Sequence, residues 1–377
     1  MHASPIGTSP TRPTSTRTPA LHRTARGRLV LLALGGASLL AGLDAALLLV
    51  GVWAPVESDR LPGLHGMVMV LGFLGTVIAL ERAQSLGRAW GYLAPAVLAA
   101  GSLALVVGAP PMLGKLLLVQ GCGFFAAVYV ALWRRAPVAM VAVQVLSAVL
   151  ALCAALLWLV IGVENLLTLL AGFIVVTIGA ERAELAQLTM GPKAPERLVA
   201  LAAALVAAIL ASLLWPAIGM RVFGLVVLGF AVWLARDDVA RRFIRTDGLR
   251  RYNAAALLAG YFWLALAGAT WLVNGYPGTQ PAYDIVIHAT FLGFAVSMIM
   301  AHAPIIFPAV LGRPLPYRPI SWLPLVMLHA GLAARVVGDL SGNNASWQAG
   351  SVITVLALLA FLIVSVLLVV THRDQHR

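Results

Sequence analysis

The sequence predicts an all-α polytopic membrane protein with about twelve transmembrane helices, and three observations support this prediction. Of the 377 residues, 61% are hydrophobic and only 11% are charged, which is too few to cover the surface of a water-soluble chain of this length. Twelve apolar runs each approach the roughly 20 residues that an α-helix needs to cross a bilayer core. The runs also lack the alternation that is typical of membrane β-barrel strands.

The apolar runs predict where each span lies along the chain. We expect that the spans together form one transmembrane domain over residues 28–371. Helices are expected because hydrocarbon offers no hydrogen-bond partner to the backbone. The predicted spans lie near residues 29–53, 62–80, 89–108, 112–133, 137–161, 165–181, 198–217, 219–235, 252–274, 283–309, 320–338 and 348–371.

The two ends of the chain are predicted to be cytoplasmic tails. Residues 1–27 are rich in Ser, Thr, Pro and Arg and contain no acidic residue, a composition that favours a disordered basic segment. Residues 372–377 form the second, short tail. A cleaved export signal is not expected, because the polar lead is long and the apolar run after it continues as a full span.

The distribution of basic residues predicts the orientation in the membrane. With a cytoplasmic amino terminus, only Arg60, Lys115, Arg221 and Arg335 of the 26 Lys and Arg residues fall on the outer side. This asymmetry follows the positive-inside rule and predicts a multi-pass protein of the cell (inner) membrane with both termini cytoplasmic. The net charge of +12 is therefore interpreted as a topology signal, and no nucleic-acid partner is expected.

An internal repeat divides the predicted spans into three groups of four. A Gly-Phe pair followed nine residues after the Gly by Glu-Arg-Ala occurs within residues 72–83 and again, 100 residues later, within 172–183. A third Gly-Phe pair begins the segment 293–304, which has His-Ala-Pro at the same distance. The second, sixth and tenth spans therefore correspond to one another, and we predict three four-helix repeats.

Two histidines near the outer face predict a haem site. His65 opens the second span and His288 lies about one turn into the tenth, so the Gly-Phe register puts them within roughly 3 Å of the same depth. Neutral imidazoles at one depth on two helices suit axial ligation of a haem iron from opposite sides. The alternative is that each histidine is a hydrogen-bonded residue at a helix interface.

Three further residues are expected to support this haem. Asp284 lies four residues before His288 on the same helical face, where its carboxylate can accept the second ring N–H. Arg60 and Arg335 lie on the outer side just beyond the histidines, where the haem propionates require positive partners. The predicted site therefore binds a b-type haem through these residues.

A second site is predicted toward the inner side. His302 and His329 lie at similar depths on neighbouring spans, and Glu81 and Glu181 approach from the inner ends of theirs. Two histidines and two glutamates suit iron, copper or zinc, or a proton relay. The alternative is that each glutamate pairs with the arginine that follows it at a helix end.

These features together resemble subunit I of the haem-copper oxidases. The resemblance rests on twelve spans with both termini inside, a threefold four-helix repeat, and histidines at the outer ends of spans two and ten. It implies a low-spin haem between His65 and His288, with Arg335 meeting the propionates. The residues from His288 to Leu315 are also similar to the NnrS family of membrane proteins, which are associated with haem, copper and nitric-oxide stress.

The departures from the oxidase pattern limit what the resemblance implies. Oxidases carry copper-binding histidines on helices six and seven, whereas spans six and seven contain no histidine here. His302 is too far from His288 to hold a second haem beside the first.

The predicted function is therefore haem-linked electron transfer or the handling of nitric oxide or a similar diatomic gas, with an electron-donor protein as partner. The alternatives are a transporter or permease, and a structural subunit whose histidines bind no cofactor; whether the protein is an enzyme, and its oligomeric state, are left open.

Overall fold

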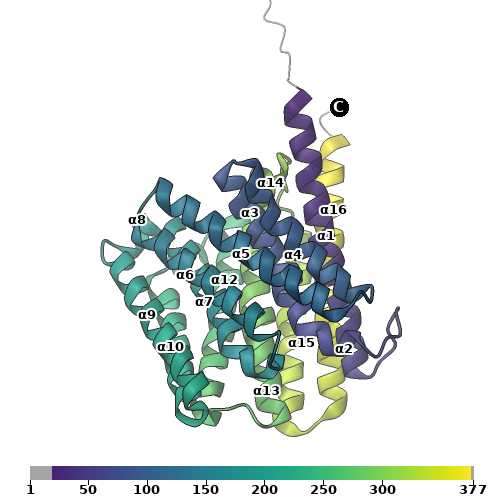
Figure 1. Cartoon of the computed structure of the whole chain (residues 1–377), viewed down its shortest axis with the longest axis vertical. Helices are drawn as coiled ribbons and strands as arrows, with labels where there is room; N and C mark the ends of the chain where they lie inside the picture. Colours follow the sequence, from purple (N-terminus) through teal and green to yellow (C-terminus); the bar gives the residue numbers. More distant parts are fainter. Residues whose placement is uncertain (1–18, 375–377) are drawn as a thin grey trace, which may run out of the picture.

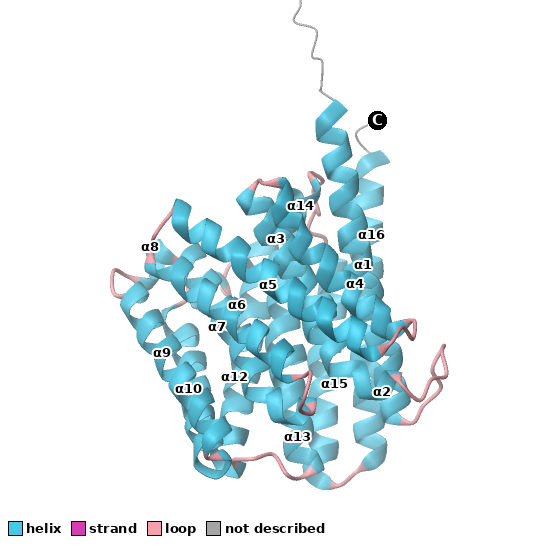
Figure 2. Cartoon of the chain, viewed as in Figure 1, coloured by secondary structure: helices cyan, strands magenta, loops and turns pink. Residues whose placement is uncertain are grey.

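The computed structural model describes residues 19–374, which form helices joined by short loops without any strand (Figure 2). Twelve helical spans are long and apolar enough to cross a membrane. The chain is therefore an all-helical, multi-pass membrane protein, and the predicted number of spans is confirmed. The first and last described residues lie at the same end of the bundle (Figure 1), as an even number of crossings requires.

Most spans consist of one long α-helix, and some of these follow a short 3-10 turn. The long helices are α1 (Pro19–Val50), α4 (Leu93–Val106), α5 (Pro111–Arg135), α6 (Ala139–Leu157), α7 (Leu167–Leu185), α9 (Ala194–Leu214), α10 (Pro216–Asp237), α12 (Gly248–Asn274), α15 (Trp322–Ser341) and α16 (Asn344–Asp374). The 3-10 turns are η2 (Ala89–Tyr92), η3 (Val163–Leu166) and η5 (Pro319–Ser321). Two short helices lie in loops, α8 (Gln187–Met190) and α11 (Ala240–Phe243).

The second and tenth spans each contain a π-helical segment. The second consists of α2 (Leu61–Met67), η1 (Val68–Gly75) and α3 (Thr76–Leu86), and the tenth of α13 (Gln280–His288), η4 (Ala289–Val296) and α14 (Ser297–Leu311). Each π segment begins four residues before the Gly of the Gly-Phe pair and ends three residues after it. The sixth span carries the same pair in a regular α-helix. Because π-helical segments are rare and often lie at functional sites, their shared position indicates that the second and tenth spans contribute to such a site.

The first helix begins earlier than the sequence predicts. Residues 1–18 of the predicted tail lie outside the described part of the chain, but residues 19–27 continue α1. Proline is favoured in the first turn of a helix, and the Ala, Leu and Arg residues that follow Pro19 have high helix propensity. The apolar span can therefore propagate its helix beyond the hydrocarbon boundary. At the other end, α16 includes residues 372–374 of the predicted second tail.

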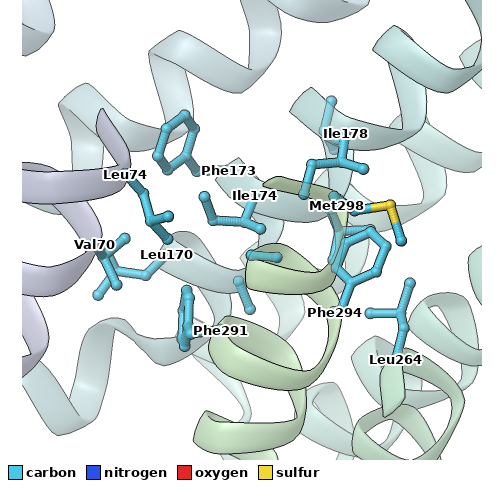
Figure 3. Close-up of a cluster of buried hydrophobic side chains, with 14 of the residues drawn as sticks. Val70, Leu74, Leu170, Phe173, Ile174, Ile178, Leu264, Phe291, Phe294 and Met298 are labelled. Carbon is cyan, nitrogen blue, oxygen red and sulfur yellow. The ribbon is translucent and has the colours of Figure 1, made fainter. Parts of the chain in front are cut away.

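The core of the bundle lies where the three Gly-Phe spans meet. Figure 3 shows side chains of the second, sixth and tenth spans packing together, with Leu170 of α7 beside Val70 and Phe291. The sixth span is the most enclosed, with 83% of its most apolar window buried. A helix that is apolar on all sides is expected in the interior of a bundle. Of the three Gly-Phe spans, the sixth, which carries no histidine, thus forms the centre of the fold.

Small residues let neighbouring spans approach closely. A side chain added at Gly268 of α12 would place its Cβ 2.7 Å from the backbone nitrogen of Leu228 and 2.9 Å from the carbonyl oxygen of Gly224, both on α10. Membrane helices commonly use glycine at such contacts, since no hydrophobic effect drives their association in lipid.

Replacing this glycine should therefore weaken the bundle. We expect Gly268→Ala to lower the free energy of unfolding by roughly 1–3 kcal/mol, because rigid backbone atoms must move apart to admit the methyl group. The thermal unfolding of detergent-solubilised protein, followed by circular dichroism, measures the effect. Gly123→Ala on α5 is the matched control, since its methyl group would meet no atom within 4 Å. Equal midpoints for the two variants would contradict the proposed contact.

Candidate functional site

A cavity of about 350 Å³ lies between the spans that carry the two predicted haem histidines. Its walls come from the last turns of α1, the first turns of α7 and α16, the short helices α2 and α13, both π segments, and Arg335 of α15. Most of its lining is aliphatic or aromatic. The polar lining side chains are His65, Gln280, Tyr283, Asp284, His288, Arg335, Trp347, Ser351 and Thr354. A mostly apolar cavity with a few polar groups has the character of a small-molecule site.

The two histidines that line this cavity are held through the same ring nitrogen. The Nδ1 atom of His65 lies 2.8 Å from the carbonyl oxygen of Gly42, and that of His288 lies 2.9 Å from the carbonyl oxygen of Asp284. A carbonyl oxygen only accepts hydrogen bonds, so each Nδ1 carries the proton and donates it. Each Nε2 therefore keeps its lone pair, which is the arrangement found in histidines that bind a metal through Nε2.

A buried ion pair borders the cavity beside His288. The guanidinium of Arg335 donates to both carboxylate oxygens of Asp284, at 2.6 and 2.5 Å, and to the hydroxyl of Ser351 at 2.7 Å. It also lies over the ring of Trp347, 5.2 Å from the centroid. The predicted contact between Asp284 and the imidazole is present, with Oδ1 at 3.3 Å from Nδ1, but Arg335 is the main partner of the carboxylate. Arg335 therefore orients Asp284, and Asp284 in turn orients His288.

The structure does not bring Arg60 to this site. Its side chain is exposed and reaches the carbonyl oxygen of Val106 at 3.4 Å, at the end of α4. Arg60 ends the loop between α1 and α2, and the guanidinium turns away from the cavity that His65 lines. The predicted role of Arg60 as a propionate partner is therefore withdrawn.

Several cavity residues were missed by sequence reasoning. Trp347 and Ser351 lie one helical turn apart near the start of α16, and Gln280 and Tyr283 lie in the first turn of α13. Their spacing puts each pair on one helical face, and this pattern could have indicated that the two residues of a pair line the same site. The sequence does not indicate, however, which neighbouring span each face meets.

The four residues of the predicted inner site belong to three separate groups. Arg82 contacts Glu181 at 2.8 Å and Glu81 at 3.3 Å. His302 lies 3.0 Å from the guanidinium of Arg182, and His329 accepts a hydrogen bond from the indole of Trp263. In the part of the chain that the structure describes, no group of three or more His, Cys, Asp or Glu side chains is placed to hold a metal ion. The alternative, in which each glutamate pairs with the arginine that follows it, fits Glu81. Glu181 instead pairs with Arg82 of the second span, while Arg182 pairs with Asp238.

The inner contacts connect corresponding positions of the three Gly-Phe spans. Arg82 of the second span binds Glu181 of the sixth, and Arg182 of the sixth contacts His302 of the tenth. His302 occupies the position that the two glutamates hold in their own spans. The second and sixth spans therefore each contact, from the arginine position, the glutamate position of the next Gly-Phe span. The tenth span has Ala303 at the arginine position, so it carries no donor for the next step.

Arg182 also belongs to a larger buried network. It donates to both oxygens of Asp238 at 2.8 and 2.9 Å, and the hydroxyl of Tyr261 donates to Oδ2 of the same carboxylate at 2.7 Å. Such complete pairing is required for charges at this depth, since an unpaired buried charge is very costly. This network was not found from the sequence, because Asp238 lies in a loop beyond the predicted span.

Over the described residues, the fold and the cavity define a twelve-span membrane protein with two histidines that line one cavity. A family model described as "Domain of unknown function (DUF8744)" matches residues 28–370, so the chain belongs to this family. No curated protein and no solved structure matches the chain.

Loss of one partner of the cavity ion pair should destabilise the protein strongly. We expect Asp284→Asn to lower the free energy of unfolding by about 3–5 kcal/mol, because it leaves the Arg335 guanidinium buried without its counter-charge. Unfolding in detergent measures the loss. The control is Asp237→Asn, whose partner Arg197 is half exposed and whose pair is worth less than about 1 kcal/mol. Similar losses in the two variants would show that Asp284 and Arg335 do not form a buried pair.

Proposed function

We propose that the protein binds one b-type haem in the cavity between His65 and His288 and acts in electron transfer or in handling nitric oxide or a similar diatomic gas. The observation that carries the proposal is the pair of imidazoles lining one cavity, each with Nδ1 bound to a carbonyl oxygen and Nε2 free. When bound, the haem would supply one-electron redox chemistry or a gas-binding iron. The protein residues would hold and orient it and exclude water from it.

The chemistry of the cavity wall fits such a group. The aliphatic and aromatic side chains of the π segments, among them Met69, Phe73 and Phe291, offer an apolar surface for the macrocycle. Arg335, Gln280 and Tyr283 offer hydrogen-bond donors for carboxylate groups. Because Asp284 already balances the charge of Arg335, the propionates would rely on neutral donors as well as on this cation.

We also propose that the twelve spans form three four-helix repeats arranged as in subunit I of the haem-copper oxidases. The equivalent positions of the π segments support this, as do the arginine contacts between equivalent sites at the inner end. Spans six and seven carry no histidine, so the proposal includes no binuclear haem-copper centre. The concentration of basic residues on one side supports a cell (inner) membrane location with both termini cytoplasmic.

Absorption spectroscopy tests the haem proposal. Protein purified in mild detergent from haem-supplied cells should show Soret and alpha bands in a reduced-minus-oxidised spectrum, and the bands should be lost or shifted in His65→Ala and in His288→Ala. His329→Ala is the control, because His329 lies in a span but outside the cavity. A colourless wild-type protein with full helical content would refute the proposal, and so would equal loss of the bands in all three variants.

The ligation state separates the two proposed roles. With both imidazoles on the iron, no position is open to a gas, so we expect the reduced protein to keep its Soret band when carbon monoxide is added. An unchanged spectrum supports electron transfer through a six-coordinate haem. A prompt shift of the Soret band would instead favour gas handling, because the gas must then displace one histidine.

A further inference from the structure

The loop between α10 and α12 carries a concentration of positive charge that its own acidic residues do not balance. Six arginines lie in residues 236–251, here named the arginine loop, and all are exposed: Arg236, Arg241, Arg242, Arg245, Arg250 and Arg251. Two of the three acids in this loop are engaged by arginines from elsewhere. Asp238 pairs with Arg182, and Asp237 pairs with Arg197 at 2.5 Å. Within the described residues, only Arg236 of the six has an acidic partner, at 3.9 Å.

The arginine loop also lies at the membrane boundary rather than out in water. It begins in the last turn of the eighth span and ends in the first turn of the ninth, so two membrane-crossing helices hold it at their inner ends. Phe243 leaves 37% of its surface exposed, and the guanidinium of Arg250 lies over its ring, 6.0 Å from the centroid. An exposed aromatic ring among arginines suits the zone where lipid headgroups meet acyl chains.

A cleft of about 320 Å³ lies at the end of the arginine loop, and its lining contains one acidic residue, Asp247, as well as Arg251. It is lined by Asp247, Gly248, Arg251, Tyr317 and Trp322. The two long helices α12 and α15 both begin here, so the positive ends of their dipoles face this region. The indole of Trp322 donates to the hydroxyl of Tyr317 at 3.1 Å, which fixes the aromatic wall.

We propose that the arginine loop and this cleft bind the phosphate headgroups of anionic phospholipids in the adjacent leaflet. Guanidinium groups bind phosphate oxygens through paired hydrogen bonds, and anionic lipids attract clustered basic residues at the membrane surface. A membrane lipid fits better than free phosphate or a soluble acidic protein, because the exposed ring of Phe243 and the aromatic cleft wall match an acyl-chain boundary. This proposal does not depend on haem binding.

Native mass spectrometry of the full chain in detergent tests the proposal. Titration with phosphatidylglycerol and with phosphatidylcholine should show preferential retention of the anionic lipid by the wild-type protein. In the triple variant Arg241→Gln, Arg242→Gln, Arg245→Gln we expect the apparent affinity for phosphatidylglycerol to fall at least about tenfold, with the phosphatidylcholine signal unchanged. Circular dichroism verifies that the helical content is kept.

The matched control removes the same charge from other loops of the same face. Arg88→Gln, Arg134→Gln, Arg135→Gln changes three exposed arginines and should leave the affinity within about twofold of wild type. Equal loss in the two triple variants would overturn the proposal, since it would mean that net charge alone attracts the lipid. Complete displacement of phosphatidylglycerol by an equal concentration of inorganic phosphate would overturn it as well, in favour of a site for free anions.

Discussion

The buried pair of Arg335 and Asp284 is the interaction on which the geometry of the cavity depends. A charged side chain at this depth has no water to solvate it, so each partner is held by the other and by the few polar groups in reach. The pair joins α13 to α15, and the bond from Arg335 to Ser351 adds α16. The same Asp284 contacts the imidazole of His288. The rotation of three spans and of one histidine is therefore fixed by one guanidinium group.

Polar contacts fix the opposite end of the bundle in a different way. There the arginines of the second and sixth spans each reach the corresponding position of the next span, and Asp238 and Tyr261 complete the pairing. Between the two ends most contacts are apolar, as Figure 3 shows for the side chains around Ile174. Lipid gives apolar side chains no preference for the interior, so these few polar contacts restrict the arrangement of otherwise similar helices.

The sequence predicted the number and limits of the spans well, because length and hydrophobicity alone determine which segments cross a bilayer. Because the rise along a helix is fixed, the sequence could also suggest that His65 and His288 belong to one site, and both line the same cavity. Rotation about each helix axis was not predictable from one chain. Two contacts show the effect of that gap: Arg60 reaches the end of α4, and His302 and His329, predicted to lie together, have different partners.

The four histidines within the spans show why depth alone does not define a ligand. His302 has both ring nitrogens engaged, Nδ1 by the carbonyl oxygen of Met298 and Nε2 by Arg182. In His329 the indole of Trp263 donates to Nδ1, so the proton lies on Nε2 and leaves no lone pair there. Only His65 and His288 combine a protonated, anchored Nδ1 with an Nε2 free to bind iron, and both line the same cavity. The environment of each ring, more than its residue type or its depth, therefore separates the proposed haem ligands from the histidines that serve packing and charge pairing.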